Sequence, residues 1–530
     1  MAEKKQFRAI KGTRDILPPD SALWNWFEQT AQDVFETFGF RDVRTPVFEE
    51  TSLFARSVGL DTDIVNKEMY SFEDHEFKDL AALRTILLLK QPSISEKKYY
   101  WSYDVQVTDF RDRIIAGMQG GQVPKTPENI KVSEDLEPFL NVISSTRDQY
   151  ELDGKSEQLE RFNLYVGHIR QLLASTTLGD DLCLRPEATA SVVRAYIEHG
   201  PHNWPGNAKL YYMGPMFRRE RPQKGRYRQF YQIGAEVLGQ SDAPGIDAEV
   251  IEMLLVFFKR VRLKNIKLQV NSIGCKDCRP KYVEVLRAEL LKVKDQLGAD
   301  SQRRIETNPL RVLDSKVPHE QPIIEELPRI SDHLCPACRE HFAALKVELK
   351  LRGVEYEESW RLVRGLDYYT RTTFEVTASG LGSQNAVCGG GRYDGLVELL
   401  GGPPTKGIGF AIGSDRAILS IQEAGDLPDL PGLAVFVAWM GAKAYLPAIH
   451  ITRKLREAGL AVELPPDEMK FKKSLGLADK LGAKYALILG EDEVASGTFT
   501  LKRLKDADQK KMNENDLLEY LESERRGSRA

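Results

Sequence analysis

The chain has 530 residues and a formal net charge of -4, from 74 lysines and arginines against 78 aspartates and glutamates. This length is enough for roughly three or four domains with their own cores. Because the net charge is slightly negative, binding of nucleic acid requires local basic patches rather than overall charge. The N-terminus lacks the apolar stretch of a secretory signal, and no run approaches the roughly 18 apolar residues of a membrane span. Six cysteines in so long a chain do not indicate a disulfide scaffold. These features predict a soluble cytoplasmic protein with no membrane partner.

The first predicted elements are a helix and a strand. Asp20 can cap a helix whose apolar residues, from Trp24 to Phe38, recur at helical spacing until Gly39 ends it. Residues 40–46 then read as a strand that stops at Pro46, because proline cannot donate to a central ladder. Taken alone, this pattern fits a helix and an edge strand that serve only for packing.

Residues 209–239 predict two strands joined by a charged loop, with apolar residues alternating along both strands. Aromatic side chains at positions such as Phe217, Tyr227 and Phe230 lie among six basic ones: Arg218, Arg219, Arg221, Lys224, Arg226 and Arg228. Cationic and aromatic groups together suit a polyanion with flat rings, either a nucleotide or a single-stranded nucleic-acid end. The alternative is a solvated basic hairpin. Just beyond the loop, Gln232 and Glu236 offer acceptors for a small cationic or donor-rich ligand.

Two cysteine pairs bracket a segment, 272–357, in which charged helical patterns replace strands. The pairs are Cys275 with Cys278 and Cys335 with Cys338. Two such pairs can complete a structural zinc site with four thiolate ligands if they converge in space. The alternative is four reduced thiols.

The last third of the chain contains a glycine-rich run and an alternating domain. Residues 389–391 are three glycines with no Gly-Lys-Ser/Thr after them, so they predict close backbone approach to a ligand rather than a phosphate loop. After a Pro/Gly linker at 425–432, strands and helices alternate up to 489, which predicts a small, mostly parallel α/β domain. A generic ligand-binding module would show the same alternation.

The sequence from Phe217 to Phe230, FRRERPQKGRYRQF, resembles motif 2 of class II aminoacyl-tRNA synthetases, and in detail that of the histidyl-tRNA synthetase family. RGLDYYT at 364–370 and the glycine-rich run resemble two histidine-specific signatures of that family. Residues 407–416 resemble motif 3, with Ser414-Asp415 where the family usually has Leu-Glu before the arginine. The resemblance implies an α+β fold, in which an antiparallel sheet flanked by helices is joined by a helical insertion and a C-terminal α/β anticodon-binding domain. It also implies a homodimer formed through motif 1 at 20–46.

The resemblance divides the chain into six segments. In the family, the strand at 68–74 turns tightly and returns as the strand that carries Arg-Pro-Glu, here at 182–189, so the residues between them are an insertion. The segments are 1–74 (catalytic core with motif 1), 75–180 (insertion of unassigned function), 181–271 (core with motif 2), 272–357 (helical insertion), 358–424 (core with the histidine motifs and motif 3) and 432–530 (anticodon-binding domain).

By the same resemblance, the protein activates L-histidine with ATP and transfers it to the 3' end of tRNA(His). Arg364 would replace the metal that other class II enzymes use at the α-phosphate, Arg218 would clamp that phosphate, and Mg²⁺ would bind the β and γ phosphates. The implied histidine-binding residues are Glu187, Thr189, Arg218, Gln232, Glu236, Arg364, Tyr368 and Tyr369. The implied ATP-binding residues are Arg218, Glu220, Arg226, Phe230 and Arg416. The implied contacts to the tRNA acceptor end are Lys224, Arg226 and Arg228.

Three other functions share parts of this pattern. A regulatory subunit of ATP phosphoribosyltransferase has the same fold but normally lacks the C-terminal domain and the motif arginines, which this chain has. A prolyl or threonyl synthetase is disfavoured by Arg364-Gly-Leu-Asp-Tyr-Tyr. An RNA-binding protein with an inactive site is disfavoured because Glu187, Arg218 and Arg416 are all present.

Overall fold

The computed structural model describes residues 7–59, 62–74, 78–89, 97–120, 123, 125–126, 129–132, 134–136, 156–176, 178–200, 204–366, 368–378, 385–428, 430 and 432–527. It consists of two compact units. The first comprises 1–14, 33–259 and 263–420, and the second 15–32, 260–262 and 421–530. Within the described ranges, no helix has the length and apolar character needed to cross a membrane.

An eight-stranded sheet forms the centre of the first unit, in the order β1-β5-β6-β11-β10-β9-β7-β8. Its six inner strands pair antiparallel, and the two-residue edge strands pair parallel. The strands are β1 Arg41–Asp42, β5 Ala208–Phe217, β6 Gln229–Gly239, β7 Ile266–Ser272, β8 Glu357–Glu358, β9 Thr370–Ala378, β10 Ala386–Arg392 and β11 Lys406–Gly413. The predicted antiparallel sheet is therefore confirmed, although β1 is much shorter than the strand predicted over 40–46.

Helices cover this sheet with apolar faces. The predicted N-terminal helix is α1 Asp20–Thr37, whose Phe35 ring packs edge-on against Tyr211, Phe257 and Phe410 at centroid distances of 5.7–5.9 Å. Phe257 belongs to α8 Pro244–Arg260, and the other two rings come from β5 and β11. Aromatic contacts thus join elements that lie far apart in the sequence. Two shorter helices, α7 Thr189–Glu198 and α14 Ser414–Ala424, each have residues in their first turn that line the site described below.

A three-stranded sheet, β2-β4-β3, confirms the predicted return strand. Strand β4 Asp180–Leu184 pairs antiparallel with β3 Tyr70–Asp74 and with β2 Phe48–Glu50. Helix α2 Thr51–Val58 and the π-helix η1 Ile64–Glu68 connect β2 to β3.

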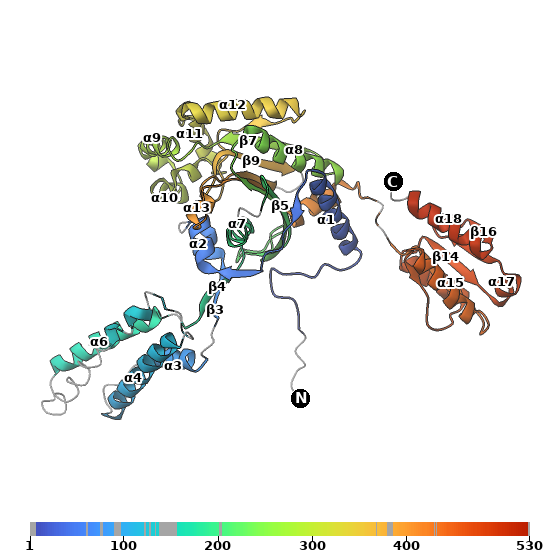
Figure 1. Cartoon of the computed structure of the whole chain (residues 1–530), viewed down its shortest axis with the longest axis horizontal. Helices are drawn as coiled ribbons and strands as arrows, with labels where there is room; N and C mark the ends of the chain where they lie inside the picture. Colours follow the sequence, from blue (N-terminus) through green and yellow to red (C-terminus); the bar gives the residue numbers. More distant parts are fainter. Residues whose placement is uncertain are drawn as a thin grey trace. The chain divides into compact units, whose positions relative to one another are not determined.

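The described residues between β3 and β4 include three helices with a core of their own. They are α3 Lys78–Leu89, α4 Lys97–Gln119 and α6 Ser156–Ala174, and Figure 1 labels them in cyan and blue. Buried Leu87, Phe110, Ile114 and Ile169 belong to one apolar cluster that contains no residue of the central sheet. The sequence pattern predicts helices over about 77–90 and about 156–173, which match α3 and α6, but it does not predict the long helix α4.

A helical segment lies between β7 and β8, as predicted. It contains α9 Arg279–Lys292, α10 Ala299–Thr307, α11 Gln321–Glu325 and α12 Pro336–Leu351, linked by the 3-10 turns η3 Lys294–Gln296, η4 Pro309–Val312, η5 Pro318–Glu320 and η6 Ile330–His333. Helix α12 contacts β9 of the central sheet (Figure 1). Buried residues of the segment, including Tyr282, Leu286 and Leu290, join the same apolar cluster as Tyr368 and Tyr369. The segment therefore packs beside the histidine motif.

The C-terminal unit contains a five-stranded sheet in the order β13-β12-β14-β15-β16. Its strands are β12 Val435–Trp439, β13 Val462–Glu463, β14 Tyr485–Leu489, β15 Phe499–Arg503 and β16 Gln509–Met512. Its helices are α15 Tyr445–Glu457, α16 Phe471–Lys480, α17 Glu491–Ser496 and α18 Glu514–Gly527. The first three strands of the order are parallel, as predicted, but β15 and β16 add an antiparallel edge that the sequence analysis missed.

Candidate active site

A cavity of about 220 Å³ opens on the central sheet and is lined by residues from several of its strands. Every residue predicted to contact histidine or ATP lines this one cavity: Glu187, Thr189, Arg218, Glu220, Arg226, Phe230, Gln232, Glu236, Arg364, Tyr368, Tyr369 and Arg416. Of the predicted tRNA contacts, Arg226 lines the cavity, whereas Lys224 and Arg228 are not among its lining residues.

Strand β6 contributes three of the residues that line the cavity. Phe230, Gln232 and Glu236 share one face of the strand, because alternate residues of a strand point the same way. Glu236 is paired in register with Gly409 of β11. A Cβ atom at Gly409 would lie 1.7 Å from Glu236 Oε2, so this glycine makes room for the carboxyl group.

Glu236 is the central group at one end of the cavity. Its Oε1 accepts a hydrogen bond from the Thr189 hydroxyl at 2.7 Å, and its Oε2 accepts one from the Tyr393 hydroxyl at 2.6 Å. Only 1% of the residue is exposed. Burial raises the pKa of Glu236 to about 8, although both hydroxyl bonds act to lower it. Such a carboxyl group favours a ligand that brings a proton donor or positive charge.

A second buried carboxyl group, Glu187, lies at the start of α7. Its two oxygens accept hydrogen bonds from the Thr189 and Ala190 backbone N–H groups at 2.7 and 3.0 Å, which satisfies orphan donors of the helix N-terminus. Burial raises its pKa despite these bonds. Among the described residues, neither Glu187 nor Glu236 has a lysine or arginine within ion-pair distance, so this end has acceptors but no resident cation.

Three tyrosines and a glutamine complete this end. The rings of Tyr368 and Tyr369 lie 4.7 Å apart, and Tyr368 packs edge-on against Tyr393 at 5.8 Å. The Oε1 atom of Gln232 is buried and has no hydrogen-bond partner in the part of the chain that the structure describes. A buried acceptor without a partner costs free energy, so Gln232 indicates a ligand donor at this position.

Guanidinium groups crowd the other end. Arg226 Nη1 lies 3.1 Å from Glu220 Oε2, and the Arg218 guanidinium lies 5.2 Å from the centre of the Phe230 ring. Arg416 at the start of α14 donates to the Gly225 and Ala386 carbonyl oxygens at 3.2 and 3.0 Å. Burial lowers the pKa of Arg416, and the nearby charges of Arg226 and Arg218 lower it further. This mutual repulsion indicates a site built to receive negative charge.

Arg364 precedes β9 and reaches the cavity beside β10. Its Nη1 donates to Glu375 Oε2 at 2.5 Å. A Cβ atom at Gly389 would lie 1.8 Å from Arg364 Nη2, so this glycine makes room for the guanidinium group against the backbone of β10. The expected close approach at these glycines is therefore made by a protein side chain.

Two functional contacts were missed in the sequence. Tyr393 holds Glu236, and its only signal in the sequence was its place two residues after the glycine-rich run. Asp415 accepts hydrogen bonds from Arg14 at 2.7 Å and from the Tyr231 backbone N–H at 2.9 Å. The carboxylate before Arg416 thus ties motif 3 to motif 2 and to the N-terminal Lys11–Asp15 turn.

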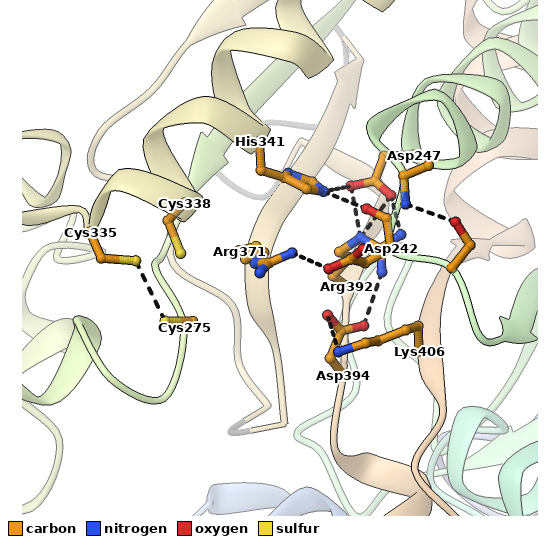
Figure 2. Close-up of polar contacts among 12 residues, drawn as sticks. Asp242, Asp247, Cys275, Cys335, Cys338, His341, Arg371, Arg392, Asp394 and Lys406 are labelled. Atoms are coloured by element: carbon orange, nitrogen blue, oxygen red, sulfur yellow. Dashed lines mark hydrogen bonds and ion pairs between the residues drawn. The ribbon is translucent and has the colours of Figure 1, made fainter.

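The four paired cysteines converge, as the zinc prediction required. The Sγ–Sγ distances are 3.8 Å for Cys275–Cys278 and 3.9 Å for both Cys275–Cys335 and Cys278–Cys338. All four sulfurs lie within 4.8 Å of one another. Figure 2 shows three of these cysteines on one side of Arg371.

An antiparallel sheet with motif 2 on β5 and β6 and motif 3 on β11 and α14 is the catalytic fold of class II aminoacyl-tRNA synthetases. The family model for histidyl-tRNA synthetase matches residues 168–279 and 311–417, and the model for the anticodon binding domain matches 434–524. The chain is 44% identical over 518 residues to the histidine–tRNA ligase of Koribacter versatilis, covering 97% of this chain and 96% of that one. Over 517 residues it is 42% identical to that of Solibacter usitatus, covering 97% and 99%. The chain therefore belongs to the histidyl-tRNA synthetase family, the ATP-dependent histidine–tRNA ligases.

A solved structure agrees with this assignment. The apo histidyl-tRNA synthetase of S. aureus matches with a TM-score of 0.65 at 28% identity, covering 98% of this chain and all of that one. The segment 75–180 lies within the span of the two alignments above, whereas most of it lies outside the family-model match. The resemblance seen in the sequence is thus confirmed.

Proposed function

We propose that this one cavity carries out both steps of histidyl-tRNA synthesis. L-histidine lies at the Glu236 end, and the triphosphate of ATP lies at the guanidinium end. The supporting observation is that buried carboxyl groups without a resident cation and a repelling set of arginines line the same cavity. The first step forms histidyl-adenylate and pyrophosphate, and the second transfers histidine to the 3' end of tRNA(His).

The first step brings a carboxylate towards an α-phosphate, so two anions must be held together. Arg218 and Arg364 neutralise the charge that develops on the α-phosphate and keep the reactants in line. Arg416 and Arg226 bind the rest of the triphosphate. Phe230 stacks on the adenine, and Glu220 accepts a hydrogen bond from it. Mg²⁺ binds the β and γ phosphates.

Histidine is recognised through its two cationic or proton-donating groups. Glu187, Thr189 and Gln232 bind the α-amino group, for which Gln232 offers its unpartnered oxygen. Glu236 and Tyr368 contact the imidazole nitrogens, and Tyr369 closes the pocket. An amino acid without these nitrogens would leave buried groups unpaired, which gives discrimination of about 10⁴ or more.

The second step also needs contacts with tRNA, both from Arg226 in the lining of the cavity and from residues outside it. Lys224, Arg226 and Arg228 in the motif 2 loop bind phosphates of the acceptor end. The C-terminal unit, which matches the anticodon binding domain, binds the anticodon end. Local basic groups are sufficient for this, so the net charge of -4 is no obstacle.

We also propose a homodimer that works in the cytoplasm. Phe48 of β2 and Phe72 of β3 are 54% and 44% exposed and lie on the same three-stranded sheet next to motif 1. Their burial against a second copy would remove apolar surface from water. Light scattering that finds only monomers at micromolar concentration would contradict the dimer.

The cysteine cluster fits one structural Zn²⁺. With Zn–S bonds of about 2.3 Å, a regular tetrahedron places its sulfurs about 3.8 Å apart. The observed 3.8–3.9 Å distances match this value and are far from the roughly 2.05 Å of a disulfide. Purified reduced protein should contain one zinc per chain by mass spectrometry, and its absence would leave four reduced thiols.

Amino-acid-dependent ATP–pyrophosphate exchange tests the assignment of the reaction. All twenty amino acids should be assayed separately with the purified chain. We expect exchange with histidine alone, because only imidazole pairs with Glu236 and Tyr368. Exchange with another amino acid, or with none, would contradict the proposal.

A further inference from the structure

The cysteine cluster lies directly against the backbone that carries the histidine-binding tyrosines. Strand β7 ends at Ser272, and the cysteine turn 275–278 follows at once. The Ile273 N–H donates to the Arg371 carbonyl oxygen, and the Arg371 N–H donates to the Gly274 carbonyl oxygen, both at 2.8 Å. Arg279 Nη1, one residue after Cys278, donates to the Tyr369 carbonyl oxygen at 2.5 Å.

The other cysteine pair is linked to the side chain of Arg371 through His341 and Asp242. Cys338 lies on α12, and one turn later His341 Nε2 is 3.0 Å from the Asp242 carbonyl oxygen. The Asp242 carboxylate accepts a hydrogen bond from Arg371 Nη1 at 2.6 Å, as Figure 2 shows. Both halves of the cluster therefore reach the same residue at the start of β9.

Arg371 needs such support because its backbone is in an uncommon conformation. Its φ is 50°, in the left-handed region that side chains other than glycine rarely adopt. Residues in this region persist where their surroundings hold them, often beside functional sites. Tyr368 and Tyr369 of the pocket directly precede this strand.

The cysteine turn itself is built for a fixed metal. Backbone N–H groups of Cys275 and Asp277 point at the sulfurs of Cys278 and Cys275, at 3.3 and 3.4 Å. Gly274 has a φ of 72°, and a Cβ atom there would lie 2.8 Å from Cys278 Sγ. Such outer contacts fix the orientation of metal ligands.

We propose that the four-cysteine metal centre is a positioning device for the histidine pocket. The centre holds the turn 273–279 rigid, Gly274 and Arg279 hold the backbone at Tyr369 and Arg371, and this fixes both tyrosine rings. The inference rests on the proposed function of the cavity. It assigns to the metal an effect on histidine binding, with no part in ATP binding or chemistry.

The test compares variants of the full chain in metal content and in separate dissociation constants for histidine and ATP. In Cys335→Ala/Cys338→Ala, we expect loss of zinc and about tenfold weaker histidine binding, with ATP binding within about twofold of wild type. Cys183→Ala, a buried cysteine outside both sites, is the matched control and should keep zinc and both affinities. Zinc loss with unchanged histidine affinity, or with equal weakening of both ligands, would overturn the proposal.

A second variant removes the hydrogen bond from Arg279 to the Tyr369 carbonyl oxygen and leaves the four cysteines in place. Arg279→Ala should keep one zinc per chain, weaken histidine binding by several-fold and leave ATP binding unchanged, while Arg279→Lys should recover part of the loss. This variant decides the matter if the double cysteine variant does not fold, since unchanged histidine affinity would overturn the proposal. Wild-type protein that lacks zinc would overturn it as well. Failure of the proposed function is distinguishable, because wild-type protein would then show no histidine-dependent exchange.

Discussion

The two ends of the cavity use opposite electrostatic arrangements. At one end, Glu187 and Glu236 are almost fully buried, and burial raises the pKa of both. At the other end, Arg218, Arg226 and Arg416 are partly exposed and lie close enough for their charges to disfavour one another. Each end is thus incomplete in the free protein, one for want of a cation or proton donor and the other for want of an anion.

This difference separates selectivity from charge neutralisation. A buried acceptor rejects any ligand that leaves it unpaired, whereas a partly exposed guanidinium group can donate hydrogen bonds to the phosphate oxygens of any nucleotide. Arg364 lies between the ends, where its guanidinium group forms an ion pair with Glu375 and packs against the backbone of Gly389. Substitutions should therefore have different signatures according to the end in which they lie.

The largest effect is expected at the junction. Arg364→Ala removes the cation beside the reacting carboxylate and α-phosphate, and should lower kcat for histidine-dependent pyrophosphate exchange by about 10²–10³-fold. Arg364→Lys should recover little, because an ammonium group does not reproduce the planar fork. Circular dichroism should show an unchanged fold, and near-normal exchange by a folded variant would remove the assigned role.

Glu236→Gln should affect the histidine end alone. It keeps the shape and the Thr189 and Tyr393 neighbours but replaces a carboxyl group that can release its proton and accept from imidazole by an amide that cannot become negatively charged, so KM for histidine should rise by about 10²-fold. KM for ATP should change little. Equal rises for both substrates would refute the assignment of this end to imidazole.

Arg416→Ala is the matched change at the phosphate end. Loss of charge-assisted hydrogen bonds to the triphosphate should raise KM for ATP by about tenfold. Histidine affinity, measured without ATP, should stay at the wild-type value. A variant that weakens histidine but spares ATP would reverse the proposed orientation of the two substrates.

The buried carboxyl group of Glu236 should also make the stability of the folded protein depend on pH. Because the pKa of Glu236 is raised from 4.5 to about 8, the folded state holds a proton that the unfolded state has released between these values. The contribution of this group to stability is therefore greatest below pH 4.5 and is lost as the pH rises through about 8. Glu236→Gln removes this dependence, so its Tm relative to wild type should rise from pH 5 to pH 8.5. A constant difference across that range would contradict the buried, proton-binding carboxyl group.

The smallest effect is expected outside the cavity. Lys224 is exposed and does not line the site. Lys224→Ala should leave pyrophosphate exchange unchanged and raise KM for tRNA(His) about two- to threefold, with a weaker salt dependence. Lys259→Ala, at an exposed position of α8 that is not assigned to tRNA, offers a control for loss of one positive charge. A change in exchange by Lys224→Ala would place this side chain nearer the reaction than proposed.

The sequence predicts those helices and strands whose pattern depends on residues close together in the chain. Helical spacing correctly predicts α1, and alternation predicts β5 and β6. In the C-terminal domain, the sequence pattern predicts a helix over 471–481 and a strand over 485–489, which match α16 and β14. Strands β15 and β16 were missed because both are short and partly polar, so they carry a weak alternation. Helix α4 was missed because its apolar residues do not form one clear stripe.

Contacts between distant residues could not be read from periodicity. Arg14 and Asp415 are 401 positions apart, and the two cysteine pairs are separated by 60. The cysteines were found because their chemistry is distinctive even when their separation is long. Tyr393 and Arg14 carry no such signal, since tyrosine and arginine are common residues whose partners are known only from the fold.

A crystal structure with L-histidine and a non-hydrolysable ATP analogue tests the central claim most directly. We expect an imidazole nitrogen within hydrogen-bond distance of Glu236 and the triphosphate along Arg218, Arg226 and Arg416, with Arg364 beside the reacting carboxylate. An imidazole bound away from Glu236, or a triphosphate outside the guanidinium end, would contradict the division of the cavity into these two ends.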